Sequence, residues 1–181
     1  MLGPEDGIWR AMADVRIEHV YDCSVDTFWD RIFFDDEYNR RLFKETLAFP
    51  VWEVKKSEDR GNEVERVVEC VPKLADLPAP IKKVVGENVG YREEGVFDKK
   101  ARRYRINIVP NKLGDKLTVK GDLWVEPAGD GKCKRIFNAT VHAKIFGIGG
   151  MLEKRLISDL QESYATGARF TNKFIAEKGL K

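Results

Sequence analysis

The sequence has few cysteines, and they follow no pattern. Its three cysteines, Cys23, Cys70 and Cys133, lie far apart in the chain. An odd number of cysteines without C-x-x-C spacing excludes a disulfide framework and the usual zinc-binding arrangements. Unpaired, reduced thiols are typical of the cytoplasm. We therefore expect a cytoplasmic protein.

Long hydrophobic runs are also absent. The longest uncharged apolar stretch, Ile145 to Leu152, is interrupted by glycines and is far shorter than the roughly 20 residues of a membrane-spanning helix. Near the N-terminus, Glu5 and Asp6 interrupt a segment that has no apolar run, which excludes the hydrophobic region of a signal peptide. We expect residues 1–11 to form a flexible leader and residues 12–181 to form a single domain.

Neither sign of charge dominates. The chain has 32 Lys and Arg residues against 30 Asp and Glu residues, a formal net charge of +2, so it has no general attraction for nucleic acid. Hydrophobic residues make up 43% of the sequence, which is enough to build one core in a chain of this length. We expect a monomeric globular domain that does not bind nucleic acid.

Catalytic and metal-binding motifs are missing as well. The two histidines, His19 and His142, lie in separate predicted strands, and no H-x-x-x-H spacing brings metal ligands onto one face. There is no G-x-S-x-G nucleophile elbow. The glycines at 147, 149 and 150 precede a helix but lack the Lys-Ser/Thr pair of a phosphate-binding loop. The motifs thus provide no catalytic residue, no metal site and no cofactor, and favour a protein that is not an enzyme.

The alternation of apolar and polar residues predicts seven strands. The first strand, Val15 to Tyr21, precedes two helices, and six more strands follow in series, separated by short turns. These six cover Val51–Lys56, Glu63–Val71, Asn88–Asp98, Arg102–Pro110, Lys116–Glu126 and Lys132–Ile145. Connections of this length indicate an antiparallel meander. A short helix over Ile81–Val85 interrupts the series.

Helical spacing appears after the first strand and at the C-terminus. Ser24 can cap one short helix, and the acidic cluster at residues 35–37 can start a second that ends before Pro50. Between Met151 and Glu177, apolar residues recur every three to four positions. At about 1.5 Å per residue this helix would reach roughly 40 Å. A helix of that length can cross a small sheet.

This order of elements resembles that of the START-like (SRPBCC) superfamily, which includes birch-pollen-allergen-like proteins, polyketide cyclases and lipid-transfer domains. The segment Cys-Ser-Val-Asp-Thr-Phe-Trp at 23–29, followed by Phe-Phe-Asp-Asp-Glu-Tyr-Asn at 33–39, is similar to bacterial START-like proteins of unassigned function. The resemblance covers residues 15–178. It implies an α+β helix-grip fold, in which a curved seven-stranded antiparallel sheet wraps around a long C-terminal helix.

The resemblance also implies a ligand cavity between sheet and helix, and the position of an arginine indicates such a cavity as well. Arg66 shares a strand face with Val64, Val68 and Cys70, and burying an arginine among apolar side chains is unfavourable unless it is paired or hydrated. Glu93 can serve as its counter-ion. A purely structural Arg66–Glu93 pair, or an edge strand from which Arg66 reaches solvent, are the alternative explanations.

The rest of the predicted cavity lining consists of polar and large side chains from the strands and small side chains from the C-terminal helix. Small side chains in the C-terminal helix leave space beside the sheet, although a tight helix-to-strand contact at Gly167 would also explain its small size. The predicted lining residues are His19, Tyr21, Trp52, Arg66, Val68, Tyr91, Glu93, Tyr104, Ile106, Ser163, Gly167 and Thr171.

Three functions fit these residues. The first is binding, or transport, of a hydrophobic or amphipathic molecule such as a lipid, sterol or polyketide-like compound. The second is a polyketide cyclase-type enzyme in which His19, Tyr91 or Glu93 acts as acid or base. The third is a scaffold domain with a filled core that binds another protein. The binding function is the one the cavity residues favour.

A lysine-containing apolar segment suggests contact with a membrane. Leu77, Ile81, Lys82 and Lys83 combine apolar side chains with two positive charges. Two lysines contribute only about 2 kcal/mol of attraction to an anionic surface. We expect transient contact at most.

Overall fold

The computed structural model describes residues 13–73, 77–86 and 89–181. The predicted leader, residues 1–11, and the predicted start of the domain at Met12 lie outside this part of the chain. So do residues 74–76 and the first predicted residue of the fourth strand, Asn88. Within the described residues the elements follow the predicted order of one strand, short helices, six strands and a long helix.

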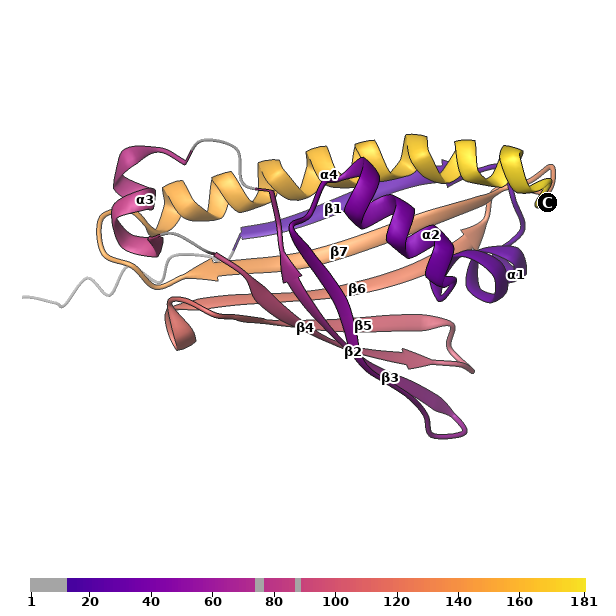
Figure 1. The fold of residues 1–181 in the computed structure, drawn as a ribbon, viewed down its shortest axis with the longest axis horizontal. Helices are drawn as coiled ribbons and strands as arrows, with labels where there is room; N and C mark the ends of the chain where they lie inside the picture. The colour runs from indigo at the N-terminus through magenta and orange to yellow at the C-terminus, as the bar shows by residue number, and fades with distance from the viewer. Residues whose placement is uncertain (1–12, 74–76, 87–88) are drawn as a thin grey trace, which may run out of the picture.

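The seven strands form a single antiparallel sheet, as the sequence predicts (Figure 1). Across the sheet the strand order is β1-β7-β6-β5-β4-β3-β2, so the first strand lies beside the last. A bulge between Val54 and Lys56 lets pairing between β2 and β3 continue beyond the predicted end of β2. The strands are β1 (Ala13–Tyr21), β2 (Val51–Asp59), β3 (Glu63–Val71), β4 (Tyr91–Asp98), β5 (Arg103–Pro110), β6 (Leu117–Pro127) and β7 (Cys133–Ala143).

Two short helices follow β1, and side-chain caps start both. The Ser24 hydroxyl accepts a hydrogen bond from the Thr27 amide at 3.1 Å, and the Asp35 carboxylate accepts one from the Tyr38 amide at 2.7 Å. Each helix then widens into a π-helical turn. The segments are α1 (Val25–Phe28) with its turn Trp29–Phe33, and α2 (Asp36–Arg40) with its turn Arg41–Thr46.

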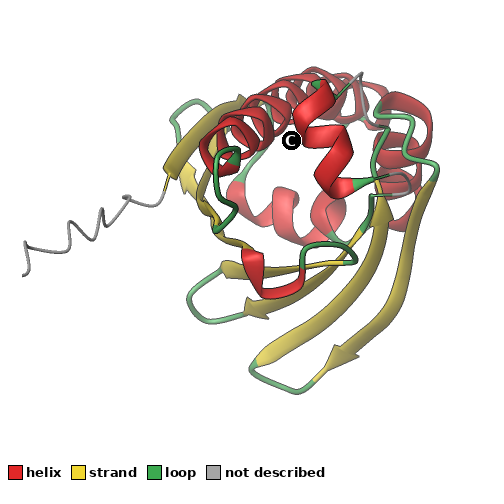
Figure 2. Cartoon of the chain, turned by 90° about the vertical axis from the view of Figure 1, so that its left-hand side faces the viewer, coloured by secondary structure: helices red, strands yellow, loops and turns green. Residues whose placement is uncertain are grey.

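The long C-terminal helix, α4 (Gly149–Lys178), packs against β1 and β7. Viewed from the end of the molecule, the sheet curls around the helices (Figure 2). The apolar stripe of α4, including Leu152, Phe170 and Phe174, is buried against the sheet and α2. Within the described residues, no helix combines the length and the hydropathy needed to cross a membrane.

Two glycines let large rings lie flat on the inner face of the sheet. A Cβ atom on Gly95 would stand 1.7 Å from the Tyr104 hydroxyl oxygen, and one on Gly121 would stand 2.5 Å from the Phe137 ring. Both glycines pair with Ile106 in the strand register. Only glycine permits so close an approach of a ring to the backbone. The middle of the inner face is therefore lined by rings from neighbouring strands.

A short helix, α3 (Ala79–Val85), lies at the end of the molecule where α4 begins (Figure 1). Ile81 is fully buried and packs with Val85, Ala143 and Leu152. Ile81 is thus a core residue that cannot contact a membrane, contrary to the expectation from the sequence. Its helical spacing turns it inward, whereas Lys82 and Lys83 are exposed.

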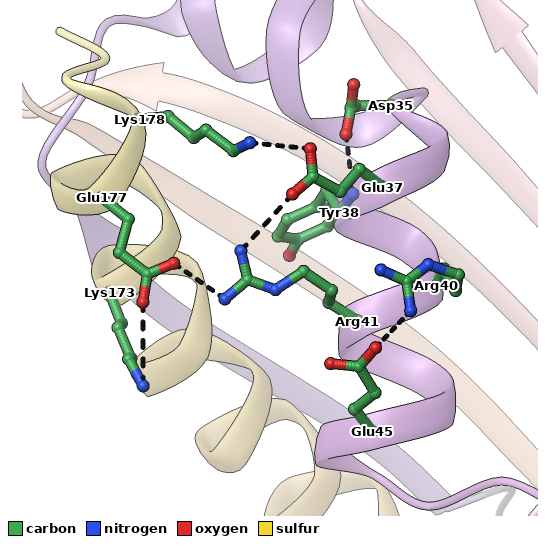
Figure 3. A network of polar contacts seen from close by, with 9 residues as sticks. All are labelled: Asp35, Glu37, Tyr38, Arg40, Arg41, Glu45, Lys173, Glu177 and Lys178. Carbon is green, nitrogen blue, oxygen red and sulfur yellow. Dashed lines mark hydrogen bonds and ion pairs between the residues drawn. The ribbon is translucent and has the colours of Figure 1, made fainter.

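At the opposite end, ion pairs join α2 to the C-terminal turns of α4 (Figure 3). Arg41 lies between Glu177, at 2.7 Å, and Glu37, at 3.7 Å. Lys178 reaches the same Glu37 at 2.7 Å. These groups are partly exposed, so each pair alone contributes little. As a network they fix α2 over the end of α4.

Candidate functional site

A cavity of about 470 Å³ lies between the inner face of the sheet, α4 and the α2 region. This volume is within the range of small-molecule sites. Most of its lining is apolar or aromatic. The apolar and aromatic lining residues include Phe33, Leu42, Phe43, Leu47, Trp52, Ile106, Ile108, Val119, Leu123, Phe137, Leu156, Leu160 and Tyr164.

The cavity reaches solvent between three segments. Its exposed lining residues are Thr46 in the turn after α2, Lys73 after β3, and Glu162 on α4. All other residues of the lining are buried or half-buried. A molecule in the cavity would therefore have a route to the surface, beside α2, that these residues border.

Eight of the twelve predicted lining residues do line this cavity. They come from four strands and from α4, so the fold brings together positions that are far apart in the sequence. These eight are Trp52, Arg66, Tyr91, Glu93, Tyr104, Ile106, Ser163 and Gly167.

The other four predicted residues, His19, Tyr21, Val68 and Thr171, lie outside the lining. Val68 is buried in the cluster around Trp52. Tyr21 is fully buried and stacks on Phe28 with ring centroids 5.6 Å apart.

Thr171 is a packing residue. Its hydroxyl lies 2.7 Å from the Tyr38 hydroxyl and donates to the Gly167 carbonyl at 2.8 Å. It therefore joins α2 to α4 beside the cavity and has no free face toward it.

His19 faces inward on β1, like the buried residues Ile17 and Tyr21, but does not line the cavity. Burial, followed by the positive charge of Arg135, lowers the pKa of His19. Its Nδ1 atom is buried and has no hydrogen-bond partner among the described residues. His19 is a neutral, half-buried strand residue at neutral pH, and it is not placed to act on a molecule in the cavity.

Gly167 borders open space. A Cβ atom added to it would meet only the Leu42 side chain within 4 Å, at 3.5 Å, an ordinary van der Waals distance. No strand approaches it that closely. The alternative explanation, a tight helix-to-strand contact at Gly167, is therefore wrong, and its lack of a side chain contributes to the volume of the cavity.

Tyr104 and Glu93 form a hydrogen-bonded pair inside the cavity. The Tyr104 hydroxyl donates to Glu93 Oε1 at 2.9 Å. Tyr104 is almost fully buried, and this burial, reinforced by the neighbouring carboxylate, raises its pKa. Its hydroxyl therefore stays protonated at neutral pH and is a hydrogen-bond donor. Glu93 therefore pairs with Tyr104. The sequence had suggested Arg66 as its partner.

Arg66 is surrounded by rings in place of a carboxylate. Its guanidinium carbon lies 5.5 Å from the ring centroid of Trp52, 5.6 Å from that of Phe33 and 5.9 Å from that of Phe34. Such distances allow cation–π attraction. Arg66 is only 6% exposed, so it does not reach solvent as an edge residue would.

A second inward arginine, Arg135, is absent from the predicted lining. It lies on β7 between the buried residues Cys133 and Phe137, and its guanidinium carbon is 4.4 Å from the Tyr164 ring centroid. The same alternation that singles out Arg66 is present here and could have identified it. Trp124 on β6 is an aromatic residue that faces outward and does not line the cavity. The guanidinium carbon of Arg103 lies 4.6 Å from the centre of its ring.

No metal site emerges in the part of the chain that the structure describes: no three His, Cys, Asp or Glu side chains group closely enough to hold an ion. His142 lies 3.5 Å from Glu153, which also accepts a hydrogen bond from the Ala143 amide at 2.9 Å. Neither residue lines the cavity.

A second hollow, of about 630 Å³, includes charged side chains from β1, β5 and β6. Several of its charged groups are already satisfied by neighbours. Arg16 pairs with Glu18 at 2.7 Å, and Asp14 accepts a hydrogen bond from Thr140 at 2.7 Å. The cavity between the sheet and α4 is therefore the stronger candidate site.

The fold is shared with several solved structures. The protein TTHA0849 of Thermus thermophilus aligns with a TM-score of 0.65 and 18% identity, over 92% of this chain and 99% of that one. Norcoclaurine synthase of Thalictrum flavum has a TM-score of 0.65 and 16% identity, over 92% and 88%. The ZhuI aromatase/cyclase of Streptomyces sp. R1128 has a TM-score of 0.65 and 10% identity, over 93% and 96%.

These similarities confirm the predicted START-like, helix-grip fold. At such low identity they establish the fold and not the activity. The sequence has no significant match among curated proteins. Residues 16–175 match the family DUF2505, described as proteins of unknown function. The chain belongs to this DUF2505 family.

Proposed function

We propose that the protein binds a hydrophobic or amphipathic small molecule, such as a lipid, sterol or polyketide-like compound, in the cavity between the sheet and α4. The observation that supports this most directly is the cavity itself, with about 470 Å³ of space and a mainly apolar lining. A few buried polar groups in an apolar pocket are the usual composition of a small-molecule site.

Apolar burial would provide most of the affinity. Each buried methylene contributes about 0.8 kcal/mol, so a ligand that places several methylenes or a ring beside Leu160 and Phe137 gains several kcal/mol. Arg66, Tyr104 and Glu93 would then orient its polar end. Tyr21 and His19, which lie outside the lining, have no part in this proposal.

The similar structures agree with such a use of the fold. One structure of norcoclaurine synthase is described in complex with dopamine and hydroxybenzaldehyde. A second similar protein is described as an aromatase/cyclase. The first description names small aromatic molecules as the bound ligands. These descriptions support a ligand of that general kind here and do not identify it.

Native mass spectrometry of the purified protein tests this proposal. We expect a species heavier than the chain, which loses a hydrophobic molecule on collisional activation, or uptake of added fatty acid or sterol by the ligand-free protein. A protein that shows only the mass of the chain, and takes up neither class of molecule, would support the scaffold function with a filled core.

A cyclase-type enzyme is the second candidate, favoured by the Tyr104–Glu93 hydrogen bond at 2.9 Å inside the cavity. A protonated hydroxyl and a carboxylate in one pocket can donate and accept protons on a bound ligand. Turnover of a polyketide-like substrate that is lost in Glu93→Gln and kept in His19→Ala would support it. Turnover that instead depends on His19 would contradict the assignment to this pair.

We also propose transient membrane contact and transport of the ligand. The surface available for this contact is smaller than the one predicted from the sequence. With Ile81 buried, the exposed charged groups at α3 are Lys82 and Lys83, beside Val84, which is 43% exposed. Transfer of a ligand to a membrane would require transient contact of this surface. Co-sedimentation with anionic vesicles at low salt should fall in a Lys82→Ala/Lys83→Ala variant. No binding by the wild type would exclude the idea.

A further inference from the structure

The cavity contains more positive than negative charge. Two arginines, Arg66 and Arg135, line it, and Glu93 is the half-buried carboxylate in the same interior. Asp159, also in the lining, is already paired with Arg155 at 2.9 Å. The charged groups at the opening, such as Lys73, are exposed and solvated. The interior thus has an uncompensated positive charge.

Arg66 is the side chain that most needs an acceptor. It is more than nine-tenths buried, and its Nε atom has no hydrogen-bond partner among the described residues. The aromatic rings around it attract the cation but give its Nε–H group no hydrogen-bond acceptor. A buried donor that lacks an acceptor is unfavourable.

Arg135, on β7, repeats this pattern in the lining of the same cavity. One of its terminal guanidinium nitrogens is buried without a hydrogen-bond partner in the described part of the chain. Its guanidinium stacks near Tyr164 and lies 5.3 Å from the ring centroid of Tyr21. Two arginines held by aromatic rings, with donors unused, face one apolar cavity.

We infer that the ligand is an anion, an apolar molecule that carries a carboxylate, and that Arg66 is the residue that holds this group. This inference rests on the proposed binding function and names its ligand class. The planar guanidinium matches a carboxylate with two parallel hydrogen bonds. Arg135 supplies a second positive charge to the same cavity, and Glu93, engaged by Tyr104, disfavours a second anionic group nearby.

The test uses cis-parinaric acid, a fluorescent polyene fatty acid, and its uncharged methyl ester. Both probes have the same hydrocarbon chain, so the difference in their dissociation constants measures the contribution of the carboxylate. We expect the wild-type protein to bind the acid at least about tenfold more tightly than the ester, as a charge-assisted hydrogen bond predicts. The Arg66→Gln variant should lose this preference and bind the ester as the wild type does.

A matched control is Arg92→Gln, on the same sheet but on its outer face. Arg92 is exposed and pairs with Glu94 at 2.8 Å, so the preference for the acid should persist in this variant. The wild-type comparison needs no variant and decides whether the ligand is an anion even if Arg66→Gln does not fold, and Arg135→Gln, which should keep the preference for the acid, then tests the assignment to Arg66. Equal binding of acid and ester would overturn the anion inference and leave the binding function standing. Binding of neither probe, together with native mass spectra that show only the mass of the chain and no uptake of sterol, would overturn the proposed function itself.

A preference for the acid that survives in Arg66→Gln but is lost in Arg135→Gln would refute the assignment to Arg66. Circular dichroism and thermal unfolding of each variant show whether a loss of binding is a loss of fold.

Discussion

Gly167 offers a test of both stability and binding at one position. Gly167 is a buried residue within α4, and a methyl group there makes only an ordinary contact, 3.5 Å from Leu42. Replacing a mid-helix glycine by alanine stabilises a helix by about 0.5–1 kcal/mol. In a chain of this size that corresponds to a rise in Tm of about 1–4 °C. Gly167→Ala should therefore be more stable than the wild type.

Leucine at the same position projects further into the cavity. If its side chain excludes two ligand methylenes, the lost burial is about 1.6 kcal/mol, or roughly a 15-fold weaker affinity. Titration with cis-parinaric acid, alongside thermal unfolding, measures both quantities for the wild type, Gly167→Ala and Gly167→Leu. A folded Gly167→Leu variant that binds the probe with wild-type affinity would refute the position of the ligand. A destabilised Gly167→Ala variant would refute the open space beside the helix.

Two further predictions concern the scaffold of the site. Gly95→Ala would push the Tyr104 ring off the sheet and should destabilise the protein by about 1–3 kcal/mol; urea unfolding with an unchanged midpoint would contradict this close packing. Arg41 lowers the pKa of Glu177 through their hydrogen bond. That pair stabilises the fold above the unfolded pKa near 4.5, and its contribution disappears as the pH falls through the lower folded value. The Tm gap between wild type and Arg41→Gln should therefore narrow below pH 4.5, and a gap that is constant with pH would contradict the ion pair.

The fold was predictable because its signals are local. Alternation along β3 placed Arg66 on the buried face, and the spacing of apolar residues in α4 located the helix to within two residues at each end. The Ser24 and Asp35 caps were readable for the same reason, since a cap depends on a few neighbouring residues. These patterns specify which face of an element is buried.

Local patterns do not specify what covers that face. His19 and Tyr21 lie on the inner side of β1, but Phe28 stacks on Tyr21, and neither His19 nor Tyr21 lines the cavity. The partner of Glu93 depends on the close approach of Tyr104 over Gly95, a contact between neighbouring strands that no single segment encodes.

The central proposal is that an anionic apolar ligand occupies the cavity with its charged end at Arg66. A crystal structure of the protein soaked with cis-parinaric acid tests it most directly. We predict density for the hydrocarbon chain alongside Gly167 and for the carboxylate within hydrogen-bond distance of the Arg66 guanidinium. A cavity that stays empty at a saturating concentration of the acid, or a ligand bound with its carboxylate away from Arg66, would contradict it.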